Sequence, residues 1–452
     1  MARLIEMDWP EPGPAPAPVV FPVAELEGRL ERLRGEMERG GLTHAVVYGD
    51  REHFANLAWL TGFDPRFEEA LLVVPLDGSP LLLAGNECMS YLPVSPLWRA
   101  GALQAERYQP FSLLDQPRDA SRGLAAILGE AGVEAGSRVG CVGWKHYGDR
   151  HAMDLPAYIV DGLRRLAGFD NVVDATEMAV RLRTRSSAAE IAYFEYTNWK
   201  ASEAMRRMQF ALREGMTDRE LIVAAGYDGL PLSCHMTCKT GPRRVSLASA
   251  SGETIRRGYP WSANVGYWGA NICRAGWVAE TAADLPGPAQ DYVEAFAGPY
   301  MDAMAAWLSA LRIGTAGGAL HALIAQRLPF EKYGIFLNAG HLIHFEEWLR
   351  SPVYAGSAEA VCSGMVFQTD VIPSHPVYFS ARMEDGLAIA DASLRAAIAA
   401  GYPEVWGRMQ ARRAFAMDTL GFPLAEEHLP LSNTFGIVAP FVLNPRRVFA
   451  IS

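Results

Sequence analysis

The stretch from Gly258 to Arg274 constrains the fold of this chain more than any other. It reads Gly-Tyr-Pro-Trp-Ser-Ala-Asn-Val-Gly-Tyr-Trp-Gly-Ala-Asn-Ile-Cys-Arg, which is mostly apolar, aromatic or small. Such a run predicts two buried strands joined in a hairpin. Its most polar side chains are Asn264, Asn271 and Arg274. Buried carboxamides need hydrogen-bond partners, so the two asparagines are either site residues or amides bonded to the sheet.

Bulk properties narrow the class of protein. A chain of 452 residues is long enough for two domains, each with its own core. The net charge of −10 argues against a nucleic-acid partner. The N-terminus lacks the apolar run of a signal peptide, and the apolar stretch 71–83 is too short and interrupted to span a membrane. The six scattered cysteines fit reduced thiols, so we expect a cytoplasmic protein without membrane contact.

The chain divides into three parts by pattern. Residues 1–22 are rich in proline and predict an extended arm, a tether or a dimer strap. Residues 23–183 alternate helical and strand patterns, which is typical of an α/β domain. The sequence Ser187-Ala188-Ala189-Glu190 is a capping box that opens a long helix, and mixed patterns continue to the end. We therefore place the domains at 23–183 and 184–452.

Several motifs together resemble the creatinase/aminopeptidase P/prolidase family. They are Asn-Leu-Ala-Trp-Leu-Thr-Gly at 56–62, Gly340-His341, Gly364–Asp370 and Arg382–Gly386, beside the hairpin itself. The resemblance implies an α/β (α+β) chain with a creatinase-type N-terminal domain and a C-terminal pita-bread domain. It also implies a homodimer that acts on a small-molecule or dipeptide-like substrate.

The resemblance assigns five ligand positions of a dinuclear metal site. The family's two hairpin aspartates correspond to Asn264 and Asn271, the second in Asn-Ile-Cys-Arg. The histidine ligand corresponds to His341, in Gly-His-Leu-Ile-His. A glutamate corresponds to Asp370, and the final glutamate to Glu384 in Arg-Met-Glu-Asp. Two carboxylates are thereby replaced with amides.

This loss of charge argues against a dinuclear centre. Two divalent ions bring four positive charges, and only Asp370 and Glu384 remain to balance them. One ion of Mn, Zn, Co or Fe on His341, Asp370 and Glu384 is chemically reasonable. The alternative is a metal-free site, as in creatinase, with His341 as general base or acid and the two carboxylates orienting it. Creatinase draws its catalytic histidine from upstream of the hairpin, where this chain has Val245-Ser246-Leu247.

Five further residues are candidates for substrate binding, each with a structural alternative: Asn264, Asn271, His344, Arg274 and Trp268. A histidine facing a carboxylate can be a satisfied buried group. Trp268 could line an aromatic pocket or belong to the core, and Arg274 could pair with a neighbouring carboxylate.

The leading functional hypothesis is hydrolysis of a C–N bond in a small molecule without a dinuclear metal centre. An Xaa-Pro-type aminopeptidase or dipeptidase with a single-ion site is the alternative. A non-catalytic binding protein, or a lyase on the same scaffold, is the third.

Overall fold

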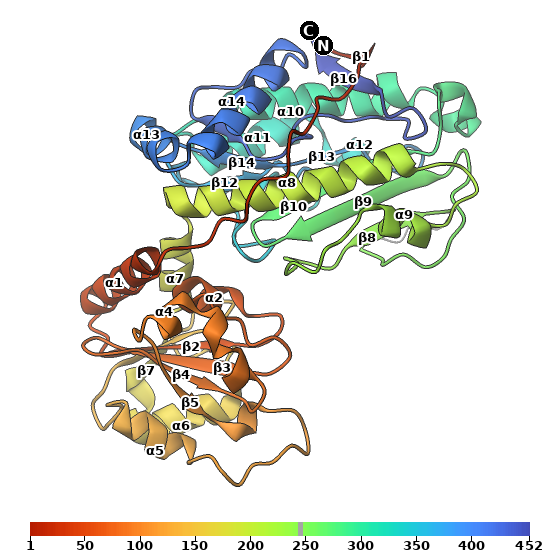
Figure 1. Ribbon diagram of the computed structural model, residues 1–452. Coiled ribbons are helices and arrows are strands. Elements are labelled where there is room, and N and C mark those ends of the chain that lie inside the picture. The colour runs from red at the N-terminus through yellow and green to blue at the C-terminus, as the bar shows by residue number, and fades with distance from the viewer. Residues whose placement is uncertain (243–246) are drawn as a thin grey trace. The chain divides into compact units, whose positions relative to one another are not determined.

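The computed structural model describes residues 1–242 and 247–452, which divide into two compact units. The N-terminal domain comprises Val20–Arg183. The C-terminal unit comprises Thr184–Ser452 together with the arm Met1–Val19 (Figure 1). The arm therefore packs with residues that are far from it in sequence.

The N-terminal domain is built on one mixed six-stranded sheet. The strand order is β5-β4-β3-β2-β6-β7, with β2–β3 and β3–β4 antiparallel and the other pairs parallel. The strands are β2 (His44–Gly49), β3 (Ala70–Pro75), β4 (Leu81–Ala84), β5 (Gln104–Arg107), β6 (Val139–Val142) and β7 (Val172–Asp174). The central strands are buried apolar runs, as expected for a sheet covered on both faces.

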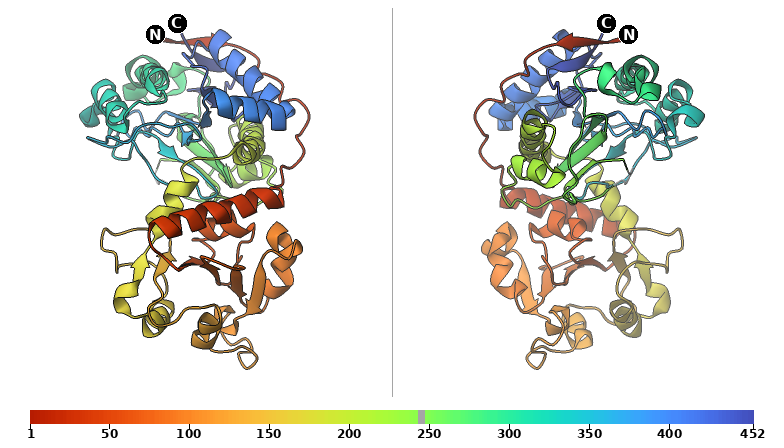
Figure 2. Two further views of the ribbon diagram at one scale, coloured as in Figure 1. Left: turned by 90° about the vertical axis from the view of Figure 1, so that its left-hand side faces the viewer. Right: turned by 90° about the vertical axis from the view of Figure 1, so that its right-hand side faces the viewer.

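Helices cover both faces of this sheet. They are α1 (Val23–Arg39), α2 (Ala55–Thr61), α3 (Cys88–Tyr91), α4 (Pro96–Arg99), α5 (Leu124–Glu130), α6 (Ala157–Ala167) and α7 (Thr176–Arg183). Ile127 of α5 and Ile159 of α6 pack with Val46 and Leu71 on one face, and α1, α2 and α4 lie on the other (Figures 1 and 2). Helix α2 ends at Gly62 with φ +67°, where a Cβ would meet Pro96 at 2.8 Å.

Two antiparallel four-stranded sheets form the centre of the C-terminal unit. One has the order β13-β10-β9-β8 and the other β11-β12-β14-β15. Their strands are β8 (Thr237–Thr240), β9 (Pro260–Tyr267), β10 (Ala270–Trp277), β11 (His341–Leu342), β12 (Val366–Gln368), β13 (Arg382–Glu384), β14 (Gly386–Ile389) and β15 (His428–Pro430). The predicted hairpin is confirmed, because β9 and β10 pair along their whole length around a turn at Trp268-Gly269.

The helices of this unit pack outside the sheets. They are α8 (Ala188–Ala211), α9 (Asp218–Ala224), α10 (Gly298–Ala310), α11 (Gly317–Arg327), α12 (Phe330–Tyr333), α13 (Ala392–Gly401) and α14 (Pro403–Asp418). The predicted capping box of Ser187 and Glu190 opens α8, whose Met205 and Met208 pack on Trp261 and Ile272 of the hairpin. Within residues 1–242 and 247–452, no helix is long and apolar enough to cross a membrane.

The arm begins with a strand that its proline content did not predict. Strand β1 (Ala2–Glu6) pairs antiparallel with β16 (Arg447–Ile451) of the same chain. Further along, the buried Trp9 donates its indole N–H to the carbonyl of Pro445 at 2.8 Å and packs edge-on against Phe210. The expectation that residues 1–22 hold no folded element is therefore wrong for residues 2–6, because their edge is completed by a strand that lies distant in sequence.

Candidate active site

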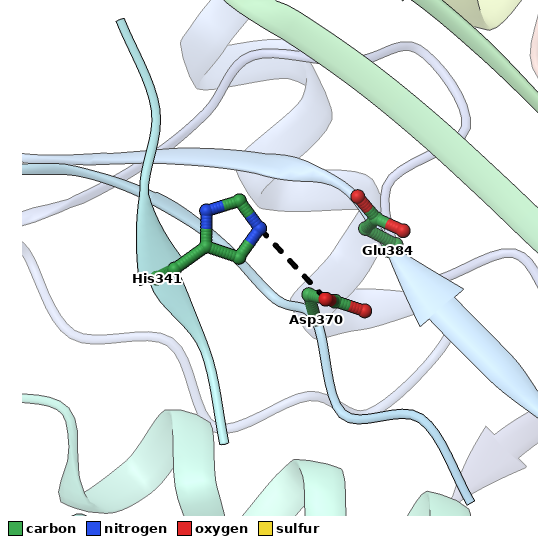
Figure 3. Close-up of side chains that lie close together, drawn as sticks. All are labelled: His341, Asp370 and Glu384. Atoms are coloured by element: carbon green, nitrogen blue, oxygen red, sulfur yellow. Dashed lines mark ion pairs between the residues drawn. The ribbon is translucent and has the colours of Figure 1, made fainter. Parts of the chain in front are cut away.

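His341, Asp370 and Glu384 converge from three separate elements of the C-terminal unit (Figure 3). His341 opens β11, Asp370 follows β12 by two residues, and Glu384 ends β13. Antiparallel pairing sets His341 opposite Gln368 and so brings Asp370 to the same end of the sheet. One ligand atom from each residue lies within 4.8 Å of the others, and all three residues are buried. The structure therefore brings together the three residues named as catalytic or metal-ligating.

The imidazole of His341 is held on three sides. Its Nδ1 lies 3.3 Å from the carbonyl of Leu342, and the ring stacks on Trp348 with centroids 4.1 Å apart. Its Nε2 lies 3.8 Å from Oδ2 of Asp370 and 3.1 Å from Oε1 of Glu347. A proton on Nδ1 that is donated to Leu342 leaves the Nε2 lone pair facing the two carboxylates.

Glu347 is a site residue that the motif comparison did not select. It lies in a loop between Leu342 and Arg350, whose backbones bond to each other and return the chain over β11. This closure places Glu347 at Nε2 of His341 and Trp348 on the ring face. The signal available in the sequence was a pair of glutamates a few residues after the ligand histidine. Their spacing differs from the family pattern, so only the loop geometry identifies which one reaches the site.

The two hairpin asparagines form a hydrogen-bonded row that ends at Glu384. The backbone N–H and hydroxyl of Thr237 both donate to Oδ1 of Asn264. Asn264 donates to Oδ1 of Asn271 at 3.3 Å, and Asn271 donates to Oε1 of Glu384 at 2.7 Å. Of the two amides, only that of Asn271 donates to a carboxylate, whereas Asn264 donates to the Asn271 oxygen and orients it. This row holds the carboxylate of Glu384 in a fixed orientation.

The buried charges perturb one another. Burial raises the pKa of Asp370, against the attraction of His341, and raises the pKa of Glu384 well above its ordinary value, with repulsion from Asp370 adding to it. For His341, burial lowers the pKa, but the charge and hydrogen bond of Glu347 and the charge of Asp370 outweigh it, so the net shift is upward. Arg382 is the cation that partly offsets the two carboxylates. The carboxylates of Asp370 and Glu384 are therefore only partly compensated by the guanidinium of Arg382.

Three of the predicted substrate-binding residues have partners elsewhere. Arg274 is buried and bonds both carboxylate oxygens of Asp385 at 2.8 and 2.9 Å. His344 lies 3.2 Å from the carboxylate of Glu190, at the start of α8. Trp268 stacks on Phe345 at 5.1 Å. These contacts match the structural alternatives for the three residues, and their roles toward a substrate stay predictions.

The chain has a histidine, His235, further upstream of the hairpin than Val245-Ser246-Leu247. His235 lies beside the row, because its carbonyl accepts from Asn264 at 3.5 Å, while its Nε2 lies 3.0 Å from the carbonyl of Leu247. The ring is therefore turned toward the backbone of a neighbouring loop. Val245 and Ser246, where the family comparison looked for a catalytic histidine, lie outside the described residues.

The donor set fits one divalent cation. Nε2 of His341 is buried, and it faces carboxylate oxygens of Glu347 at 3.1 Å and Asp370 at 3.8 Å. Its other ring nitrogen faces a backbone carbonyl, which is the usual arrangement around a histidine that binds a metal. Two carboxylates complete a set of mixed nitrogen and oxygen ligands suited to Mn, Zn, Co or Fe. A second ion would lie against the amides of Asn264 and Asn271, which bring no charge.

Known proteins share this architecture. Residues 29–185 match the family model described as the Creatinase/Prolidase N-terminal domain. The fold is similar to that of dipeptidase PepE from Mycobacterium ulcerans, with 20% identity, a TM-score of 0.61, and 82% of this chain and 94% of that chain covered. It is also similar to a prolidase from Thermococcus sibiricus, with 15% identity, a TM-score of 0.63, and coverage of 90% and 96%. No curated protein matches the sequence.

A third similar structure comes from a protein that is not described as a peptidase. The N-terminal domain of FACT complex subunit SPT16 from Cicer arietinum (chickpea) is similar at 15% identity and a TM-score of 0.58, with coverage of 81% and 94%. At these identities the likenesses establish the fold, which is the creatinase-type N-terminal domain followed by the pita-bread domain. With the domain match, they confirm the resemblance seen in the motifs. Residues 29–185 thus form a Creatinase/Prolidase N-terminal domain, and the fold of the chain is that of the dipeptidase and prolidase structures.

Proposed function

We propose that the protein hydrolyses a C–N bond of a small, dipeptide-like molecule at a site without a dinuclear metal centre. The observation that carries the proposal is the row from Asn264 to Glu384. Its amides occupy the two positions where the family resemblance implies carboxylates, and the Asn271 N–H is aimed at Glu384 at 2.7 Å. Neutral amides cannot compensate a second dication in a buried pocket.

The single-ion form of this chemistry has one observation in its favour over the metal-free form. The buried Nε2 of His341 is turned toward carboxylate oxygens, and ligand atoms of His341, Asp370 and Glu384 all lie within 4.8 Å of one another. His341, Asp370 and Glu384 would hold the ion, which would polarise the scissile carbonyl and acidify a bound water when present. Asn271 holds Glu384 in orientation, and Arg382 offsets the negative charge. A cytoplasmic location and a homodimer stay predictions of the sequence.

Elemental analysis of protein purified without chelator tests whether the site lacks a dinuclear metal centre. We expect one equivalent or less of transition metal per chain, because the hairpin supplies no carboxylate. Two tightly bound equivalents would contradict the proposal and favour an ordinary dinuclear peptidase.

The variant His341→Gln, assayed on a panel of dipeptides and small amides, tests whether the site hydrolyses a C–N bond with His341 as a catalytic or metal-binding residue. Turnover should fall on the order of a hundredfold to ten-thousandfold, which is the usual contribution of one positioned catalytic group. His321→Gln, in α11 of the same unit, is the matched control and should keep full turnover. Loss of activity with chelator and recovery with added ion indicates the single-ion form, whereas indifference to chelator indicates the metal-free form. Unchanged turnover in His341→Gln, or ligand binding without any hydrolysis, would favour the binding-protein hypothesis.

A further inference from the structure

Glu347 is the carboxylate nearest to the ring nitrogen of His341, and the family pattern does not explain it. Its Oε1 lies 3.1 Å from Nε2, closer than the 3.8 Å of Asp370. Its side chain keeps 25% of its exposure, so it stands at the solvent side of an otherwise buried cluster. The loop that carries it is closed by the backbone bonds between Leu342 and Arg350, and Arg350 is itself paired with Glu359.

This approach needs a positive species between the two atoms. When Nδ1 donates to the carbonyl of Leu342, Nε2 presents a lone pair to an anionic oxygen at 3.1 Å. Two lone pairs at that distance repel unless a proton or a cation lies between them. Two ligand atoms bonded to one ion at about 2.1 Å, at tetrahedral to octahedral angles, lie roughly 3.0–3.4 Å apart. The separation of 3.1 Å falls in that interval and also in the range of an N–H···O hydrogen bond, so either a cation or a proton can join the two atoms.

A count of charges selects the same residue. Asp370 and Glu384 bring two negative charges, and a divalent ion would neutralise them. The neighbouring guanidinium of Arg382, whose Nη1 lies 3.4 Å from Sγ of Cys273, then remains without a compensating carboxylate. A third carboxylate removes this excess. Glu347 supplies this third carboxylate, since its Oε1 lies 3.1 Å from Nε2 of His341.

We propose that Glu347 is a ligand of a single divalent cation held with His341, Asp370 and Glu384. It would supply, from the loop after β11, negative charge that Asn264 and Asn271 no longer bring from the hairpin. This inference rests on the single-ion form of the proposed function. It makes the site a four-residue mononuclear centre with one ligand at the solvent edge, rather than a dinuclear centre from which ligands have been lost.

Metal titration of the full chain tests this assignment. Protein stripped with chelator is titrated with Mn²⁺ by calorimetry, and with Co²⁺ by visible absorption, which reports the ligand field. We expect the wild type to bind about one ion, and Glu347→Gln to bind it about tenfold to hundredfold more weakly with an altered Co²⁺ spectrum. Glu404→Gln is the control, because Glu404 is an exposed glutamate of α14 in the same unit. It should match the wild type in both readouts.

Two results would overturn the assignment, and each leaves a different account of the function. Equal Mn²⁺ affinity in Glu347→Gln and the wild type would remove Glu347 from the centre while leaving a single-ion hydrolase intact. A wild type that binds no Mn²⁺ or Co²⁺ would mean that a proton joins His341 to Glu347. Hydrolysis measured in the presence of chelator would then decide the proposed function independently. Melting temperatures of all three proteins, measured without metal, exclude misfolding as the cause of weak binding.

Discussion

Replacing Arg274 with leucine separates a structural role from a substrate-binding role for this residue. Its guanidinium is 2% exposed and bonds Asp385, which is fully buried, through both carboxylate oxygens. It also donates to the carbonyls of Ile437 and Thr434 at 2.8 Å each. Arg274→Leu would leave a buried carboxylate without its counter-charge and several carbonyls without a donor.

The size of the effect follows from this geometry. At 2.8 Å and an effective dielectric constant of about 20, the attraction between Arg274 and Asp385 is at most about 6 kcal/mol. Desolvation consumes part of it, and breaking a buried pair by removing one partner typically costs about 3–5 kcal/mol. For the C-terminal unit, an unfolding entropy of about 2.1 cal/mol/K per residue converts this cost into a fall in melting temperature of roughly 5–8 °C.

Differential scanning calorimetry on the full chain measures this directly. Arg257→Leu is the control, because Arg257 pairs with Glu214, Glu280 and Asp284 but is 35% exposed. Exposed pairs are each worth about 0–1 kcal/mol, so the transition should move only slightly. If Arg274→Leu melts within about 2 °C of the wild type and loses only substrate affinity, the structural account is wrong and Arg274 binds substrate.

Two further predictions concern stability. Trp9→Ala should destabilise the C-terminal unit by about 3 kcal/mol and open the arm to proteolysis, because it removes a buried ring packed on Phe210; wild-type melting and protease resistance would contradict this. Burial lowers the pKa of His428, whose Nδ1 accepts from a backbone N–H while Nε2 lies 2.5 Å from the carbonyl of Leu311. The unfolded chain therefore takes up this proton first, so stability is retained above about pH 6.5 and falls below it by up to about 1.4 kcal/mol per pH unit. Urea unfolding from pH 7 to pH 5 should show this slope, and His428→Gln should flatten it; an equal slope in both proteins would refute the assignment.

Sequence patterns predicted what depends on local order and on shared motifs. The hairpin of β9 and β10 follows from one apolar run, and the start of α8 follows from the capping box of Ser187 and Glu190. The grouping of His341, Asp370 and Glu384 follows from motif positions, since no local pattern brings three such distant residues together.

What the sequence did not predict depends on long-range partners. The sequence predicted that Arg274 could pair with a neighbouring carboxylate, but not that the partner is Asp385. The register between β10 and β13 decides which carboxylate is near. The contact of His344 with Glu190 joins the segment after β11 to the first turn of α8, which is more than 150 residues earlier in the chain. The position of Glu347 beside His341 depends on a loop that is closed by backbone hydrogen bonds. Such bonds do not require particular residue types, so the sequence does not predict them. In each case the sequence shows a charged or polar side chain but does not predict which residue it contacts.

The pairing of β1 with β16 sets an order for folding during synthesis. Residues 2–6 must wait for residues 447–451, so the ribosome has to produce the 440 residues between them before the strand has an edge to join. The N-terminal domain, Val20–Arg183, contains its own sheet and core and can fold while the arm is still free. Closing so long a loop costs entropy that rises only slowly with length, and the already compact domain shortens the effective loop further. The arm therefore stays unpaired for most of translation. Its pairing with β16 would be a late step in the assembly of the pita-bread domain.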